Sequence, residues 1–303
     1  MSEPVTKKKT VSYSQFSTWF TCPHRWYRDV ILKEKVFEDS IHMSFGTGIH
    51  EAIQLYLTTL YHKTEAEADA LGLVLVFAAA FKREVVKKNI PHTQAEFDRF
   101  IEDGKNILTE FTDPSNRKLY FPRDKWELLG IETDIREDII NNVILNGKLD
   151  IVLKEKISGD IRIVDIKTSG RGWSSNDKED FTKIAQLRLY KALYSKKYNI
   201  PLSKIHTEFF ILKRNLYENC KYKQSRIQLF TPSTYKTDIL LTIQEFRKFV
   251  EHCFTPQGIH NTTTNYPKIP NEGKNCKWCI YAKNGKCNQI PDVLEKSSDV
   301  YNR

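Results

Sequence analysis

The sequence lacks any long apolar segment. In its 303 residues no uninterrupted apolar run approaches the roughly 18 residues needed to span a bilayer, so no membrane partner is expected. Residues 1–10 are polar and carry three consecutive lysines, with no apolar stretch behind them, so we expect no secretory signal and a cytoplasmic location. In that reducing setting the six cysteines are expected to be metal ligands or core residues rather than disulfides.

Internal repeats and long low-complexity stretches are also missing, so a repeat architecture is not expected. What is present is the composition of an ordinary folded protein, 40% hydrophobic and 28% charged. Lysine and arginine together number 47 against 38 acidic residues, a net charge of +9. This excess suits a polyanionic partner without proving one.

Helical and strand patterns follow one another in blocks along the chain. Periodicity predicts helices over residues 11–30, 44–61, 66–88, 94–111, 181–198 and 233–253. Strands are expected between 126 and 167, with a turn at Asn141-Asn142, and in a hairpin of 205–213 with 222–230. The order predicts an α/β fold with a mixed central β-sheet flanked by helices, not a regular doubly wound one.

The most informative segment is Asp165-Ile166-Lys167, which closes the apolar run 161–164. Residues two apart on a strand point to the same face, so Asp165 and Lys167 are expected to project together. Asp150 lies on the preceding alternating segment, and the turn at Ser158-Gly159 can bring it alongside. Two carboxylates and a lysine at the ends of paired strands can bind a divalent cation and handle a proton, as metal-assisted phosphodiester hydrolysis requires.

Three more residues are candidates for the same site. His50, near the start of a predicted helix, can be a third cation ligand, although a solvated helix histidine is the simpler interpretation. Gln186 and Tyr190 are spaced i, i+4 on the helix after Lys167, so they share a face that can support the lysine or touch a phosphate. As an isolated pair they fit ordinary packing positions equally well.

In this order, Gly46-xxx-His50, Gly147-xx-Asp150, Asp165-x-Lys167 and Gln186-xxx-Tyr190 resemble the four motifs of the RecB-like branch of the PD-(D/E)XK nuclease superfamily. One departure is Asp165 where the family usually has Glu. The resemblance implies that His50, Asp150, Asp165 and the Ile166 carbonyl hold Mg²⁺ or Mn²⁺. It implies that Lys167 orients or deprotonates the attacking water, and that Gln186 and Tyr190 position it. Glu132, on the strand before Asp150, is a candidate for an additional acidic member and is left outside the core set.

The resemblance also implies one nuclease domain over residues 1–303, with a restriction-endonuclease-like core. Its parts are then N-terminal helices with Cys22 and His50 (12–61), a helical insertion (62–122), a catalytic α/β core (123–253) and a C-terminal cysteine segment (254–303).

Half of the cysteines lie near the end of the chain, as Cys276-x2-Cys279-x7-Cys287. Cys22, followed by Pro23, is the best candidate for a fourth ligand. Spacing alone does not distinguish tetrahedral zinc from an iron–sulfur cluster, since both accept four thiolates. A Cys-Pro helix with a C-terminal triplet is similar to the iron–sulfur nucleases, which include AddB-type and CRISPR-associated RecB-like members. That similarity implies a [4Fe–4S] cluster.

Basic pairs with aromatic neighbours, such as Lys213-Arg214 and Lys221-Tyr222-Lys223, fit a groove that follows phosphates, and each is equally compatible with a solvated surface. Trp173, soon after Lys167, is a candidate for stacking on a base. We therefore expect a metal-dependent DNA exonuclease acting on single strands or ends in recombination, repair or replication. Without a GxxxxGK[ST] phosphate loop the chain resembles phage or CRISPR-associated members more than a helicase subunit, and a phage origin implies the host cytoplasm.

Two alternatives remain open. One is a DNA-holding scaffold without catalysis. The other is a subunit that acts only within a larger helicase or CRISPR-type assembly, with a replication or recombination protein as partner.

Overall fold

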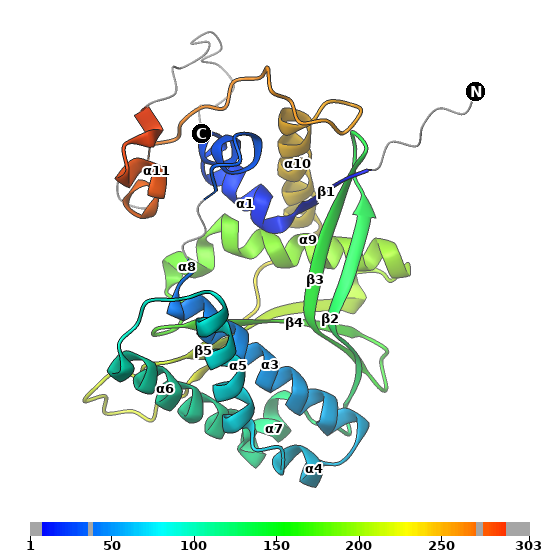
Figure 1. Ribbon diagram of the computed structural model, residues 1–303. Helices are drawn as coiled ribbons and strands as arrows, with labels where there is room; N and C mark the ends of the chain where they lie inside the picture. Colours follow the sequence, from blue (N-terminus) through cyan, green and yellow to red (C-terminus); the bar gives the residue numbers. More distant parts are fainter. Residues whose placement is uncertain (1–7, 36–38, 271–274, 289–303) are drawn as a thin grey trace. The chain divides into compact units, whose positions relative to one another are not determined.

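The computed structural model describes residues 8–35, 39–270 and 275–288 (Figure 1). The chain folds into two compact units. The first comprises Met1–Phe37, Arg136–Gly147 and Leu240–Arg303, and the second comprises Glu38–Ile135 and Lys148–Ile239. The division into segments of one nuclease domain stays a prediction.

The strands form a six-stranded mixed sheet in the order β1-β3-β4-β5-β6, with β2 paired to β3. The strand bounds are β1 Lys9–Ser12, β2 Trp126–Asp138, β3 Val143–Glu155, β4 Ile161–Ser169, β5 Ile205–Lys213 and β6 Ile227–Phe230. β4 runs antiparallel to β3 and parallel to β5, and β5 is antiparallel to β6. The predicted fold class, a mixed sheet flanked by helices, is confirmed.

In the second unit the helices cover both faces of β4 and β5. α3 (Ile41–His62), α5 (Leu73–Lys87) and α6 (Gln94–Thr112) lie on one face, and α9 (Phe181–Tyr198) lies on the other (Figure 1). Phe45, Phe77 and Phe100 pack with Val164 and Ile166 of β4 in one hydrophobic core. Because side chains alternate along a strand, Asp165 and Lys167 must project away from this core.

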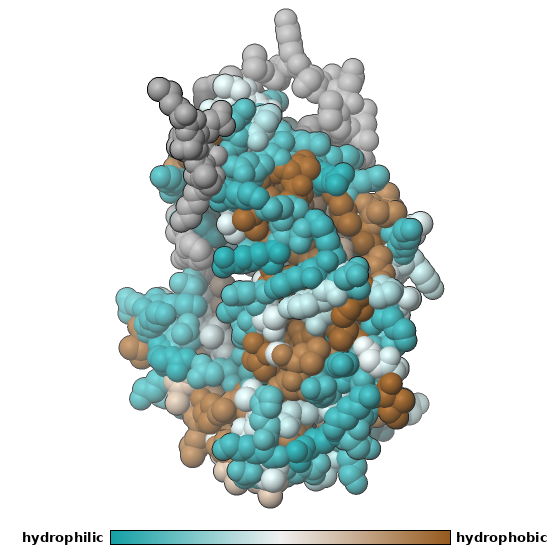
Figure 2. Space-filling model, turned by 90° about the vertical axis from the view of Figure 1, so that its right-hand side faces the viewer, coloured by the Kyte–Doolittle hydropathy of each residue, from teal (hydrophilic) through white to brown (hydrophobic). Residues whose placement is uncertain are grey.

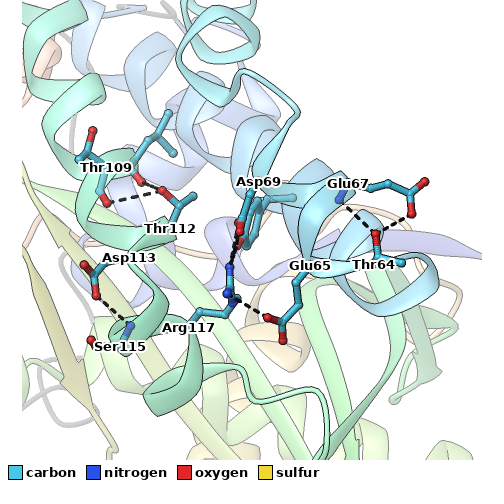
Figure 3. Close-up of polar contacts among 11 residues, drawn as sticks. Thr64, Glu65, Glu67, Asp69, Thr109, Thr112, Asp113, Ser115 and Arg117 are labelled. Atoms are coloured by element: carbon cyan, nitrogen blue, oxygen red, sulfur yellow. Dashed lines mark hydrogen bonds and ion pairs between the residues drawn. The ribbon is translucent and has the colours of Figure 1, made fainter.

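Arg117 fastens the helical insertion to α3 within this unit. It lies on α7 (Pro114–Tyr120) and donates hydrogen bonds to Asp69 and Glu65 of α4 (Glu65–Asp69), at 2.8 and 2.9 Å (Figure 3). It also donates to the Tyr56 hydroxyl of α3 at 3.1 Å. Side chains also cap the helices here, since Thr64 accepts from the Glu67 amide and Asp113 from the Ser115 amide (Figure 3). The insertion is thereby joined to the helix that carries His50.

Three sequence-based boundaries are wrong. The helix expected over 66–88 is broken at Gly72, whose φ of 60° is left-handed, into α4 and α5. The strand expected from Tyr222 begins only at Ile227. Residues 11–30 are not one helix but β1, α1 (Tyr13–Thr21), α2 (Pro23–Trp26) and a π-turn (Tyr27–Ile31), because Cys22 takes an extended conformation before Pro23.

The first unit has an aromatic core of its own. Trp26 is fully buried and packs edge-on against Phe249 of α10 (Lys236–Cys253) and against Phe254, and it stacks on Tyr266. Short helical turns follow at Cys276–Trp278, Ile280–Lys283 (α11) and Lys286–Asn288.

On the face shown in Figure 2 apolar side chains gather in several separate patches between hydrophilic ones. Among the described residues, none of the helices combines the length and the apolar character that crossing a membrane demands.

Candidate active site

Asp165 and Lys167 form an ion pair on the face of β4 opposite the hydrophobic core. The Lys167 ammonium lies 2.7 Å from the Asp165 carboxylate, which is buried. It also donates to the Gln186 side-chain oxygen, 3.1 Å away on α9. The predicted same-face arrangement of these residues is present.

Asp150 lies where the ladder between β3 and β4 stops. The paired residues run from Lys154↔Ile161 to Ile151↔Val164, and continuing the register would place Asp150 opposite Asp165. Instead, the Asp150 carboxylate accepts a hydrogen bond from the Ile166 amide at 2.8 Å. The side chain of Asp150 thus accepts the hydrogen bond that a backbone carbonyl of β3 would accept in a continued ladder. This places the Asp150 carboxyl beside that of Asp165, between the two strands.

His50 reaches this position from α3. Its Nδ1 lies 3.6 Å from Asp150 Oδ2, and the backbone of Ile166 also hydrogen-bonds to the ring. Burial lowers the pKa of His50, with Asp165 opposing the shift. The imidazole is therefore neutral near pH 7, the form that ligates a metal.

Glu132 is the residue that sequence reasoning left out. It lies on β2 with a left-handed φ of 49°, a conformation that costs a non-glycine residue free energy and is concentrated at functional sites. Gln54 donates to one of its carboxylate oxygens, and Lys148 lies 3.1 Å from the other. Among the described residues, His50, Glu132 and Asp150 form a group whose ligand atoms all lie within 4.8 Å of one another.

The backbone twist at Glu132 explains the omission, because alternation along a strand does not reveal where a left-handed residue will point its side chain. The one feature of the sequence that could have indicated Glu132 is that it is an acidic residue on β2, the strand that pairs with β3, which carries Asp150.

Gln186 and Tyr190 lie together, as their spacing predicts. The Gln186 amide donates to the Tyr190 hydroxyl at 3.3 Å, while its oxygen accepts from Lys167. Burial raises the pKa of Tyr190, so the phenol remains protonated. The pair therefore holds the ammonium of Lys167 from the α9 side.

Burial and neighbouring charges together set the ionisation of the acid–lysine cluster, the group formed by His50, Glu132, Asp150, Asp165 and Lys167. Burial and the nearby Asp165 raise the pKa of Asp150. Burial alone would lower the pKa of Lys167, but Asp165 and Asp150 outweigh it and the pKa is raised. With its pKa raised to about 8, Asp150 holds a proton near pH 7 until a cation displaces it. The cluster therefore gathers carboxyl oxygens and a neutral imidazole around one point, beside a lysine that remains an ammonium. Oxygen-rich sites of this kind suit Mg²⁺ and Mn²⁺.

A cleft opens directly onto these residues. Its volume is about 690 Å³, and it is lined by His50, Glu132, Ile166 and Lys167, with Met43 on α3 and Lys88 directly after α5. The site is thus accessible to a large substrate.

A protein-family comparison decides the superfamily. The model of the PD-(D/E)XK nuclease superfamily matches residues 10–283, most of the chain. The chain belongs to this superfamily. Among solved structures, the crystal structure of a "Putative exonuclease" from Eubacterium rectale is similar, with a TM-score of 0.51 and 12% identity, covering 98% of this chain and 96% of the other. That likeness concerns the fold alone. No curated protein matches.

In this PD-(D/E)XK protein the four candidate cluster cysteines all lie in the first unit. Burial raises the pKa of the Cys287 thiol. Lys268 opposes this shift, and the neighbouring thiols of Cys22, Cys279 and Cys276 add to it. The other three thiols therefore lie close enough to Cys287 to influence its ionisation. Among the described residues, no three of the sulfur atoms lie within 4.8 Å of one another. Cys253 is buried, whereas Cys220 is exposed in the second unit.

Hydrogen bonds bring the cysteine segments together within the first unit. Arg28 donates to the Lys286 carbonyl at 2.8 Å, and the Tyr281 hydroxyl donates to Asp29 at 2.6 Å. The His24 amide donates to the Pro267 carbonyl. The segment after Cys22 is thereby attached to the segment that carries the C-terminal cysteines.

Proposed function

We propose that this chain is a metal-dependent DNA nuclease of the RecB-like branch, acting as an exonuclease on single-stranded DNA or DNA ends. Recombination, repair or replication is the process it would serve. The observation that carries the proposal is the meeting of His50, Glu132 and Asp150 beside the Asp165–Lys167 pair. Membership of the PD-(D/E)XK superfamily supports the same chemistry.

The residues present fit a divalent cation. Asp150, Asp165 and Glu132 supply hard oxygen ligands, the Ile166 carbonyl is adjacent, and burial keeps His50 neutral. Bound there, Mg²⁺ or Mn²⁺ would polarise the scissile phosphate and lower the pKa of a coordinated water.

We assign Lys167 to orienting the attacking water and offsetting charge on the phosphate. Removing a proton would require a neutral amine, whereas Asp165 and Asp150 hold this group as an ammonium by raising its pKa. Gln186 and Tyr190 act through Lys167 and are positioning residues.

The test is a time course on 5′- and 3′-labelled single- and double-stranded DNA with Mg²⁺ or Mn²⁺. Lys167→Met should reduce cleavage by on the order of 10²–10³-fold while leaving DNA binding largely intact. Lys183→Met, on the same helix as Gln186 and paired with Asp177, is the matched control and should cleave normally. Undiminished cleavage by the Lys167 variant would remove this site assignment.

The products decide the finer points. Release of mononucleotides from one labelled end supports an exonuclease of that polarity, and internal fragments contradict it. Cleavage by the purified chain alone contradicts the alternatives of a passive scaffold and of a subunit active only in a larger assembly.

We further propose that Cys22, Cys276, Cys279 and Cys287 hold a [4Fe–4S] cluster. The influence of the other three thiols on the pKa of Cys287 supports a shared ligand, and the hydrogen bonds of Arg28 and Tyr281 support the pairing of the two segments. Zinc is the alternative ligand of the same four thiolates.

Anaerobically purified protein tests this proposal. Iron, sulfide and a visible thiolate-to-iron absorption band are expected, lost in Cys287→Ser and retained in Cys220→Ser, whose thiol is exposed elsewhere. A colourless preparation with one zinc per chain would overturn the iron–sulfur assignment.

A further inference from the structure

The connection between β5 and β6, residues 214–226 and here called the β5–β6 loop, has no part in the proposed catalytic chemistry. We propose that it holds single-stranded nucleic acid beside the active site, with bases stacked on Tyr217 and Tyr222 and phosphates against the neighbouring lysines. The inference rests on the proposed nuclease function, because it describes how the substrate of that site is held.

The loop leaves the sheet at the same end as the catalytic residues. β4 and β5 are parallel, and Lys167 pairs with Ile211 and Ser169 with Lys213. Just beyond this point the Arg214 amide donates to the Ser169 carbonyl at 2.9 Å, and the Asn215 amide to the Gly170 carbonyl at 2.8 Å. The start of the loop is therefore attached to the segment that follows Lys167 directly.

Arg171, in the segment that follows Lys167, also contacts the tip of the β5–β6 loop. Its guanidinium lies 5.5 Å from the ring centre of Tyr217. Arg171 lies only four positions after Lys167, so an extended chain places their Cα atoms at most about 14 Å apart. A strand whose phosphate lies at Lys167 therefore has the Tyr217 ring within reach of its neighbouring nucleotides.

The loop is preformed. At its end, the amide of Arg226 and the hydroxyl of Ser225 both donate to Glu110 of α6. At its tip, the Gln224 side chain accepts from the Tyr217 amide at 2.8 Å and donates to the Tyr217 carbonyl at 2.7 Å. Because these bonds fix the backbone in advance, presenting the tip to a ligand requires little additional ordering.

The side chains at the tip suit a nucleic-acid strand. Tyr217 and Tyr222 are 60% and 83% exposed, an unusual position for large aromatic rings. Tyr222 stands between Lys221 and Lys223, both exposed, and Glu218 is the one acidic residue of the loop. Accessible rings with flanking cations are the combination by which proteins bind single strands, stacking on bases and following phosphates.

The form of the substrate follows from the rings. A base in a duplex already stacks on its neighbours, so an exposed tyrosine gains a stacking partner only from an unpaired strand. The loop should therefore favour single strands or frayed ends over closed duplex.

The experiment compares the full chain with the double variant Tyr217→Ala/Tyr222→Ala. On single-stranded DNA the variant should show a KM raised roughly 5- to 100-fold. This is the loss of affinity expected when bases no longer stack on one or two aromatic rings. On bis(p-nitrophenyl) phosphate, which is too short to reach the loop, kcat and KM should be unchanged. Tyr217→Phe/Tyr222→Phe should restore DNA binding, because the rings remain.

Tyr235→Ala is the matched control, since that tyrosine is also exposed, at 78%, but lies outside the loop. Equal KM values for the wild type and the Ala variant on single-stranded DNA would overturn the inference. So would an equal loss on closed duplex, since that indicates phosphate contact without stacking. A wild type that cleaves neither DNA nor the small diester would instead refute the proposed function, so the two failures are distinguishable.

The exposed thiol of Cys220, at the tip, gives a second readout. Oligonucleotides bearing one thiol-reactive disulfide should couple to Cys220 most readily when the disulfide lies a few nucleotides from the cleavage position, and not at all in Cys220→Ser. Coupling that is independent of that position would contradict a fixed strand path.

Discussion

At the scale of single residues, the site gathers groups that repel one another. Asp150 is buried next to Asp165, and its pKa is raised mainly by burial and then by that neighbour. A carboxyl whose pKa is higher in the folded than in the unfolded state lowers stability at every pH above its unfolded-state pKa, because the unfolded chain can ionise the group and the folded chain cannot do so as easily. Without a cation, the arrangement that suits Mg²⁺ is therefore a source of instability.

Asp150→Asn should consequently stabilise the metal-free protein. At pH 7 in EDTA we expect a gain on the order of 1–2 kcal/mol, or about 2–6 °C in Tm, while DNA cleavage is lost. The unfolded-state pKa is near 3.8 and the folded-state pKa is higher, so stability falls as pH rises through this window and the advantage should be smaller at pH 5. Thermal unfolding at both pH values measures it.

Asp160→Asn is the control, because the pKa of Asp160 is shifted in the opposite direction to that of Asp150. Lys204 and His206 lower the pKa of Asp160, so removing its charge should not raise the Tm. A lower Tm for Asp150→Asn in EDTA would contradict the electrostatic account of the site.

Glu132→Gln tests whether this acidic residue takes part in cation binding. The amide keeps the size of the side chain but removes a charge within 4.8 Å of the His50 and Asp150 ligand atoms. The Mg²⁺ concentration for half-maximal cleavage should rise about 10- to 100-fold. Glu127→Gln, on the same strand and exposed, should leave the Mg²⁺ titration unchanged. An unchanged titration for the Glu132 variant would place that residue outside the metal site.

These residues also show how far the sequence could be interpreted. Asp165 and Lys167 could be placed on one face because alternation along a strand is a fixed geometric rule. Spacing placed Gln186 and Tyr190 on one helix face, and the roles of these two residues and of His50 followed from a resemblance. The structure brings all three to the same cluster. Glu132 was left outside the core set because the direction of its side chain depends on its own left-handed backbone conformation, which alternation does not predict.

At the scale of elements, periodicity located the helices and strands but not their interruptions. Leu73–Lys87 and Glu65–Asp69 have compatible helical patterns, and only the left-handed Gly72 separates them. β1 was missed because four residues carry too little alternation to be recognised. Trp173, expected to be free for stacking, packs against Phe209 and Phe230, because the segment after β4 returns to the sheet.

The helical insertion depends on one buried cation. Arg117→Met leaves Asp69, Glu65 and the Tyr56 hydroxyl without their shared donor, so unfolding free energy should fall by about 2 kcal/mol. This is less than for a fully buried pair because both carboxylates are about half exposed. Urea unfolding measures the change. Lys105→Met, which breaks the exposed pair with Glu102, should change stability by less than about 0.5 kcal/mol, and an equal loss in both variants would contradict the role of Arg117.

At the scale of the whole molecule, the two proposed sites lie in different units. The acid–lysine cluster belongs to the second unit, and the four cysteines belong to the first. The sequence could not show this division, because the first unit is assembled from three separated stretches of chain. Periodicity describes local elements, whereas the packing that defines a unit joins residues far apart in sequence.

Cys22→Ser should therefore destabilise one unit and spare the other. A ligand shared by Cys22 and the C-terminal triplet closes a loop of about 250 residues, and by analogy with a cross-link of that length its loss should cost roughly 3–5 kcal/mol. In calorimetry, one transition should shift to lower temperature, while the transition that Mg²⁺ raises should stay in place, since the ligands of that cation lie in the second unit. Cys220→Ser, with an exposed thiol, should shift neither. A parallel shift of both transitions would show that the two units unfold together, and no shift would show that the four thiols hold no common ligand.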